Sequence, residues 1–215
     1  MLFKLIYLFH SDFSWLNVFR YITFRTILSS LTGLTLCFFV GAWGIKKLRN
    51  LQIGERIRED GPPGHQAKAG TPTMGGCLIL PAIVLATLMW ADPFNRYIQL
   101  AAFVVLFFGA IGFADDYSKV TGKNPKGMGA STKFMLQIMG ALVVALTLYF
   151  SPEFDATLNV PFLKNIAPDL GWGYIPLAVF IIVGTSNAVN LTDGLDGLAI
   201  SPLIVAFACY LIFAY

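Results

Sequence analysis

The chain has 215 residues, of which 56% are hydrophobic and only 13% are charged. Soluble domains average about one quarter charged residues, so this composition argues against an ordinary soluble fold and indicates that lipid is the solvent. The net charge of +3 is too small to indicate a nucleic-acid-binding protein, and we predict no nucleic-acid partner. We therefore expect an all-α, polytopic membrane helix bundle in contact with the lipid bilayer.

Six stretches between charged residues are long enough to cross a bilayer. A helix that spans about 30 Å of hydrocarbon needs roughly 20 residues, and its backbone groups must be paired within the segment. The stretches are Thr26–Ile45, Ala69–Ala91, Tyr97–Ala114, Phe134–Pro152, Leu170–Thr192 and Gly197–Tyr215. We predict about six transmembrane helices, with residues 1–215 forming a single transmembrane domain.

Lysine and arginine residues predict how these helices are oriented. The connections after the second and fourth stretches carry only Arg96 and Lys164. Those after the first and third carry ten basic residues: Lys46, Lys47, Arg49, Arg56, Arg58, Lys68, Lys119, Lys123, Lys126 and Lys133. Because cytoplasmic loops are enriched in lysine and arginine, residues 46–70 and 115–133 are predicted to be cytoplasmic. Arg20 and Arg25 oppose this orientation but are outnumbered.

The same orientation predicts which parts of the chain lie outside. The N-terminus is expected outside, and residues 1–21 are expected at the outer membrane interface, because their apolar start is too short to span. Residues 151–173 form an outer loop, in which Pro152, Pro161 and Pro168 favour a small hairpin.

The loop from Asp60 to Gly76 is rich in glycine and proline. Thr71 followed by Pro72 is a good N-cap and first-turn pair for the second predicted helix. Lys68 would then lie near a helix N-terminus, where it could contact a phosphate group. The alternative interpretation is a flexible inner loop without a ligand.

Two adjacent carboxylates, Asp115 and Asp116, end the third predicted helix. Each would cost roughly 0.3–1 kcal/mol at the negative end of a helix, and the two repel each other. Such a pair is expected to be protonated, paired with lysine or arginine, or bound to a cation. Mg²⁺ bound together with phosphate oxygens fits this chemistry, and neutralisation by Lys119 or Lys123 is the competing interpretation.

The basic loop from Lys119 to Lys133 contains Gly122, Gly127 and Gly129. Its charge could attract anionic headgroups or a nucleotide diphosphate to the membrane surface. Ordinary topogenic charge is the alternative interpretation of the same residues.

The segment from Asn187 to Leu198 follows the fifth predicted helix. Its two Asp-Gly steps, at Asp193 and Asp196, indicate a tight turn and the start of another helix, which either aspartate could cap. Asn187 and Asn190 stand three residues apart at the inner end of the preceding helix, where buried amides need partners. Carboxylates, amides and lysines therefore converge on the predicted cytoplasmic edge of the bundle, which suits an anionic substrate and a divalent cation.

At these residues the chain resembles the phospho-N-acetylmuramoyl-pentapeptide transferases. The matching stretches are Asn17–Arg25, Asp60–Gly76, Phe113–Lys119 and Asn187–Ala199. The last two are typical of the wider family of polyprenyl-phosphate N-acetylhexosamine-1-phosphate transferases, whereas Lys68–Gly76 is specific to the muramoyl-pentapeptide branch.

The resemblance implies a reaction and a location. UDP-N-acetylmuramoyl-pentapeptide would give its phosphosugar to undecaprenyl phosphate, forming lipid I and UMP with Mg²⁺ as cofactor. The protein would be a multi-pass protein of the bacterial inner membrane, with a periplasmic N-terminus, a cytoplasmic active site and a possible homodimeric state. Residues 151–173 would then form a periplasmic loop.

The resemblance also implies residue roles. Asp115 and Asp116 match the family's aspartate pair, of which one deprotonates the lipid phosphate or, in a rival scheme, acts as nucleophile. The pair is also a candidate for binding the metal. The remaining matches fall on substrate-binding positions: Lys68, Thr73, Lys119, Lys133, Asn187, Asn190, Asp193 and Asp196.

The chain departs from the family pattern in length. Members have about ten spans, and a third aspartate that holds the metal and a histidine cluster lie in later loops. We therefore expect this chain to be an incomplete copy without activity of its own. The alternatives are a non-catalytic or split membrane module, a transporter, and a sister transferase that uses UDP-N-acetylglucosamine.

Overall fold

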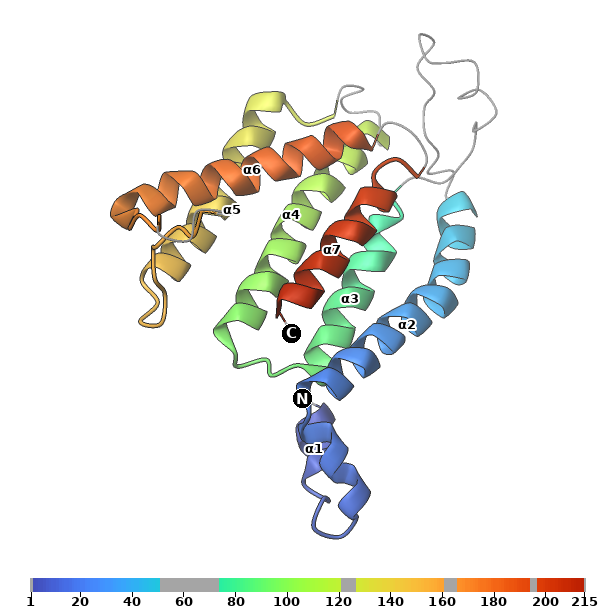
Figure 1. The fold of residues 1–215 in the computed structure, drawn as a ribbon. Helices are drawn as coiled ribbons and strands as arrows, with labels where there is room; N and C mark the ends of the chain where they lie inside the picture. The colour runs from blue at the N-terminus through green and yellow to red at the C-terminus, as the bar shows by residue number, and fades with distance from the viewer. Residues whose placement is uncertain (1, 51–73, 121–126, 161–165, 194–196, 215) are drawn as a thin grey trace. The chain divides into compact units, whose positions relative to one another are not determined.

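The computed structural model describes residues 2–50, 74–120, 127–160, 166–193 and 197–214, and no strand occurs in these ranges (Figure 1). The helices, in chain order, are α1 (Leu2–Tyr7), the 3₁₀ helix η1 (Ser14–Arg20), α2 (Ile22–Asn50), α3 (Gly76–Trp90), α4 (Arg96–Val120), α5 (Ala130–Tyr149), the 3₁₀ helix η3 (Gly171–Gly173), α6 (Tyr174–Thr192) and α7 (Ile200–Ala214). The predicted all-α fold class is confirmed.

Each predicted span overlaps one helix between α2 and α7. Four helices are long and apolar enough to cross a membrane: α2, α4, α5 and the continuous segment Gly171–Thr192. Helices α3 and α7 are apolar but have 15 residues each, which at 1.5 Å per residue is about 22 Å. The described part of the chain is a helical membrane bundle, and the protein is a membrane protein.

Several helices extend beyond the predicted spans. Helix α2 continues past Lys46 to Asn50, and α4 continues past Asp115 to Val120. Helix α5 begins at Ala130, so Lys133 lies in its first turn. The physical reason is that a charged residue marks the edge of the apolar region, whereas helical hydrogen bonding can continue into water. Residues 46–50, 115–120 and 130–133, which were predicted to belong to loops, are therefore helical.

The start of α3 also differs from its prediction. The helix begins at Gly76, with Gly75 at the N-cap position. Met74 has a φ of +69°, a left-handed conformation that interrupts any helical path just upstream of α3. The residues that would have formed the predicted cap lie outside the described ranges.

The chain divides into two compact units, Met1–Lys133 and Phe134–Tyr215, and each is described by itself. The single transmembrane domain expected for residues 1–215 stays a prediction.

In the first unit, α3 packs antiparallel between α2 and α4. A Cβ on Gly33 of α2 would lie 3.6 Å from that of Ala86, and one on Gly44 would collide with the side chain of Leu78. Close approach at Gly44 is therefore possible only because it lacks a side chain. Gly109 of α4 stands in the same way against Leu80, on α3. The end of α2, the start of α3 and the end of α4 consequently lie at the same end of this unit.

The N-terminal segment packs at the opposite end of the first unit. Leu16 and Phe19 of η1 form a buried cluster with Trp90, at the end of α3. The Trp90 indole donates a hydrogen bond of 2.9 Å to the Thr32 hydroxyl on α2. The Lys4 ammonium lies 2.9 Å from the Asp92 carboxylate, and this contact lowers the pKa of that carboxyl. The segment is thus packed against the ends of two helices, while its position at the outer interface stays a prediction.

In the second unit, one isolated bridge lies where a small hairpin was predicted, while residues 161–165 lie outside the described ranges. Thr157 and Asp169 form an isolated antiparallel bridge in the connection between α5 and α6. The Asp155 carboxylate accepts hydrogen bonds from the hydroxyl and the backbone N–H of Thr157, and these bonds lower its pKa. Beside this turn, the rings of Tyr149 and Trp172 lie 5.0 Å apart, so that aromatic contacts join the neighbouring ends of α5 and α6.

Candidate active site

Asp115 and Asp116 lie on α4 but face different surroundings. Successive helical residues are rotated by about 100°, so the two carboxylates leave the helix in different directions. The Asp115 side chain is 13% exposed and that of Asp116 is 42% exposed. Because α4 ends at Val120, both precede the last helical turn, so the predicted cost from the helix dipole is smaller than expected.

Lys119 joins the two carboxylates. Its ammonium lies 2.8 Å from Asp115 Oδ2 and 3.2 Å from Asp116 Oδ1, at the helical spacings i,i+4 and i,i+3. Lys133, in the first turn of α5, places its ammonium 3.9 Å from the same oxygen of Asp115. Two negative and two positive groups therefore meet at one end of the first unit. Neutralisation by Lys119, one of the sequence-based alternatives, is found in the structure, whereas Lys123 lies outside the described residues.

The segment before α5 covers Asp115. The Met128 backbone N–H donates a hydrogen bond of 2.8 Å to Asp115 Oδ1. Gly127 has a φ of +76°, and a Cβ there would collide with Asp115 Oδ1 and the Lys119 side chain. This close approach requires glycine. Sequence reasoning missed the Met128 contact, because a backbone donor leaves no mark on residue type. The glycines of the basic loop were the available signal.

The carboxylate oxygens of this cluster differ in whether they could bind Mg²⁺. Within the described residues, no group of three or more His, Cys, Asp or Glu side chains is arranged to hold a metal. Asp115 Oδ1 is occupied by the Met128 N–H and Oδ2 by Lys119. Asp116 makes one contact with Lys119 and is partly exposed. Since Mg²⁺ is commonly held by one or two carboxylates together with substrate phosphates, Asp116 fits as one protein ligand.

The second unit holds three of the predicted substrate residues. The Asn187 side chain donates hydrogen bonds to Gln137 Oε1 on α5 at 2.8 Å and to the Val183 carbonyl at 2.9 Å. Asn190 is exposed near the end of α6. Asp193 is the C-cap residue of α6, and its N–H donates to the Val189 carbonyl at 3.1 Å. Asp193 therefore does not cap α7, which begins only at Ile200.

Three predicted substrate residues, Lys68, Thr73 and Asp196, lie outside the described residues. The structure brings together Asp115, Asp116, Lys119 and Lys133 in the first unit. Asn187, Asn190 and Asp193 lie in the last two turns and C-cap of α6 in the second unit.

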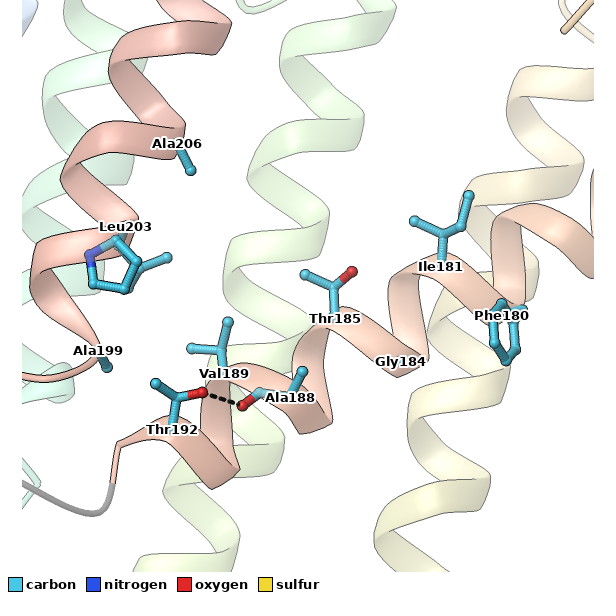
Figure 2. Close-up of a pocket in the computed structure, with 11 residues that line it drawn as sticks. Phe180, Ile181, Gly184, Thr185, Ala188, Val189, Thr192, Ala199, Leu203 and Ala206 are labelled. Carbon is cyan, nitrogen blue, oxygen red and sulfur yellow. Dashed lines mark hydrogen bonds between the residues drawn. The ribbon is translucent and has the colours of Figure 1, made fainter. Parts of the chain in front are cut away.

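A groove between α6 and α7 belongs to the second unit (Figure 2). Its walls are almost entirely apolar, and the Thr192 hydroxyl at one end donates to the Ala188 carbonyl of its own helix. None of the residues that line it is charged. The groove therefore lacks the ionic groups that chemistry on a diphosphate needs.

Comparison of the chain with known proteins supports the resemblance seen in the sequence. The family model of glycosyl transferase family 4 matches residues 98–215, and phospho-N-acetylmuramoyl-pentapeptide-transferase signature 1 matches residues 68–80. The chain is 53% identical over its full length to the phospho-N-acetylmuramoyl-pentapeptide-transferase of Syntrophus aciditrophicus and covers 60% of that protein. Proteins of the same name from Desulforapulum autotrophicum and Desulfotalea psychrophila are 54% and 51% identical, again over all of this chain and 60% of theirs.

The resemblance to the phospho-N-acetylmuramoyl-pentapeptide transferases is thus confirmed, and the chain spans 60% of the length of these relatives. The matched region begins in α4, contains the aspartate pair, and extends through α7. Since the family model covers more than half of its residues, the chain belongs to glycosyl transferase family 4.

Proposed function

We propose that the protein transfers phospho-N-acetylmuramoyl-pentapeptide from its UDP conjugate to undecaprenyl phosphate, which yields lipid I and UMP. The observation that carries this proposal is the cluster of Asp115, Asp116, Lys119 and Lys133. In this cluster each lysine ammonium lies no more than 3.9 Å from a carboxylate oxygen of the aspartate pair. The printed name of the relatives supports the choice of sugar, as does the signature match at residues 68–80.

The reaction needs positioning and charge neutralisation rather than elaborate covalent chemistry. An oxygen of the lipid phosphate attacks the phosphorus that bears the sugar, and the bond between that phosphorus and UMP breaks. We assign the contact with the acceptor phosphate to Asp116, which is the more exposed carboxylate, and it takes the proton of that phosphate. Asp115 is the anchor, since its oxygens are held by Met128 and Lys119.

The lysines carry the positive charge that the diphosphate requires. Lys119 contacts both carboxylates and is 44% exposed, so its ammonium can reach a phosphate without leaving the cluster. Mg²⁺, with Asp116 as one ligand, would supply further charge neutralisation at the phosphate oxygens. We place Lys68, Thr73, Asn190, Asp193 and Asp196 in the pocket for the UDP-sugar as part of the same proposal. Asn187 was also predicted to bind substrate, but its side-chain nitrogen donates to Gln137 and to the Val183 carbonyl, so we leave it out of the pocket.

Membrane insertion is established by the apolar helices, and the relatives come from bacteria. The inner membrane is proposed from the resemblance to the transferases, and the periplasmic N-terminus and cytoplasmic site are proposed from the distribution of lysine and arginine. The possible homodimer stays a prediction.

The complete gene product, purified in detergent, provides the test. With Mg²⁺, undecaprenyl phosphate and UDP-N-acetylmuramoyl-pentapeptide, it should release UMP and form a lipid-linked phosphosugar, and omission of either substrate should abolish both products. UDP-N-acetylglucosamine should neither replace the muramoyl substrate nor compete with it. Transfer of N-acetylglucosamine phosphate would instead favour the sister transferase, and the absence of any transfer would contradict the proposal.

A further inference from the structure

A polar side chain is buried in α5, away from the charged cluster. Gln137 is 3% exposed and lies on the same helix face as the fully buried Ala141 and Ala145. Buried polar groups need hydrogen-bond partners, particularly in a protein surrounded by lipid. The partners of Gln137 therefore indicate what the residue does.

Those partners lie on α6. Gln137 Oε1 accepts a hydrogen bond of 2.8 Å from Asn187 Nδ2, and Gln137 Nε2 lies 3.3 Å from the Ser186 hydroxyl. Asn187 Nδ2 also donates to the Val183 carbonyl at 2.9 Å. Because an amide nitrogen has two hydrogens, these two bonds use both donors of Asn187. Its nitrogen has no hydrogen left for a ligand.

We propose that Gln137 is a positioning residue, which holds Asn187 and thereby fixes the end of α6 that presents Asn190 and Asp193 to the UDP-sugar. We call the hydrogen bonds from Gln137 on α5 to Asn187 and Ser186 on α6 the tie between these helices. Asn187 then belongs to this tie instead of contacting substrate. What the end of α6 binds rests on the proposed function, whereas the tie itself rests on the hydrogen bonds within the second unit.

The position of the tie suits this role. Asn190 lies one turn beyond Asn187, and Asp193 lies at the C-cap of the same helix. Helix ends fray, so a fixed point less than two turns from the end restricts where these side chains can move. Replacing Gln137 by an apolar residue would leave Asn187 without its acceptor on α5, and the end of α6 would be held less tightly.

The first test compares Michaelis constants of the complete gene product. Gln137→Met has nearly the same volume but no amide, and it should raise KM for the UDP-sugar about tenfold, the effect of one typical hydrogen bond. KM for undecaprenyl phosphate should stay unchanged. A merely structural role would instead lower the fraction of active protein, so that Vmax falls while both KM values stay the same; that result would overturn the inference.

Two further variants sharpen this comparison. Thr147→Val removes a polar group from the same helix, but the Thr147 hydroxyl bonds only within α5, to the Val143 carbonyl at 2.7 Å, so its kinetics should match the wild type. Asn187→Leu should raise the same KM as Gln137→Met, and the double variant should be no worse than either one, because both remove one tie. Additive effects would contradict the proposed coupling.

A distance measurement tests the tie without relying on enzymatic activity. Spin labels at Val143 on α5 and Leu191 on α6 occupy exposed positions, in a background where Cys37, Cys77 and Cys209 are serine. The distance distribution between the labels in lipid nanodiscs should broaden in Gln137→Met and not in Thr147→Val. Unchanged distributions would refute the tie. If the wild type transferred no phosphosugar, the proposed function would fail, and these distributions would still decide whether Gln137 fixes α6.

Discussion

Asp115 and Asp116 are neighbours in the chain, yet their hydrogen bonds give them different tasks. Asp115 is nearly buried beneath Met128, with both oxygens engaged, while Asp116 is partly exposed and contacts Lys119 at 3.2 Å. A residue that receives a proton from a substrate must be reachable, whereas one that organises its neighbours must be held. The structure therefore separates the reactive carboxylate from the supporting one in our proposal.

Asp116→Asn in the complete enzyme should lower turnover by about 10²–10⁴-fold, the usual contribution of a positioned acid or base. The amount of protein inserted into membranes, measured by immunoblot of washed membranes, should not change. Asp12→Asn, which alters an exposed carboxylate in the N-terminal segment, serves as the control and should retain full turnover. Unchanged turnover of the Asp116 variant would count heavily against the assignment.

Gly127→Ala should destabilise the segment that covers Asp115. The φ of +76° is unfavourable for alanine, and its Cβ would collide with Asp115 Oδ1, so we expect a loss of about 1–3 kcal/mol. Gly129→Ala is a matched control two residues later, because its Cβ would meet only the Thr132 hydroxyl at 3.7 Å. Thermal unfolding in detergent should show a lower midpoint for the first variant alone. Equal midpoints would mean that the turn is not needed.

At the scale of helices, the spacing of charges predicts which segments are helical but not where the helices end. Each of the six apolar stretches overlaps a helix, because a helix pairs its backbone groups within one segment, as lipid requires. Their ends were misplaced at Lys46, Asp115 and Lys133, since these residues leave the hydrocarbon while still hydrogen-bonded in a helix. The cover of Asp115 by Met128 could not be predicted, because it joins backbone to side chain across a turn.

The position of Gln137 in the sequence already indicates a contact between helices. It is a long polar residue within the otherwise apolar stretch from Phe134 to Tyr149, and such residues usually face a partner inside the bundle. Its partner on α6 could not be named from the sequence, since pairing between antiparallel helices depends on their crossing geometry.

The contact between α2 and α3 yields a prediction about helix packing. Gly44→Leu should lower the unfolding temperature in detergent by several degrees, because its side chain would compete with Leu78 for the same space. Gly41→Leu lies one turn earlier, where a Cβ would have no neighbour within 4 Å, and it should leave that temperature unchanged. A similar loss in both variants would show that α2 does not pack through Gly44.

The ion pair between Lys4 and Asp92 yields a pH dependence. Because the pKa of Asp92 is lowered in the folded protein, its contribution to stability is present above the ordinary value of 3.8 and is lost as pH falls through the lowered one. Asp92→Asn should therefore unfold at a lower temperature than the wild type at pH 6, and this small gap should close at pH 2.5. High salt should also reduce the gap, since both side chains are exposed. A gap that is independent of pH would refute the assignment.

At the scale of the whole molecule, the proposal requires the aspartate pair and the end of α6 to face the same side of the membrane. In the first unit, the basic end of α2 and the end of α4 lie together, as the distribution of lysine and arginine predicts for cytoplasmic residues. The N-terminal segment packs at the other end, beside Trp90.

Cysteine labelling in intact cells tests this orientation. In a background without native cysteines, Tyr117→Cys and Leu198→Cys should react with a membrane-impermeant maleimide only after the inner membrane is opened. Asp12→Cys and Glu153→Cys should react in cells whose outer membrane alone is permeable. All four positions are exposed. Labelling of positions 117 and 198 from opposite sides would contradict the proposed active site, because the aspartate pair and the end of α6 would then face different sides of the membrane.

The cluster of Leu16 and Phe19 with Trp90 also sets an order of events during biosynthesis. Ribosomes add about 5–20 residues per second, so the N-terminal aromatic residues emerge several seconds before the tryptophan that completes their packing. Until α3 has been inserted, they must be sheltered by lipid headgroups or by the insertion machinery. The first twenty residues can therefore reach their final packing only after α3, the second predicted span, has been inserted into the membrane.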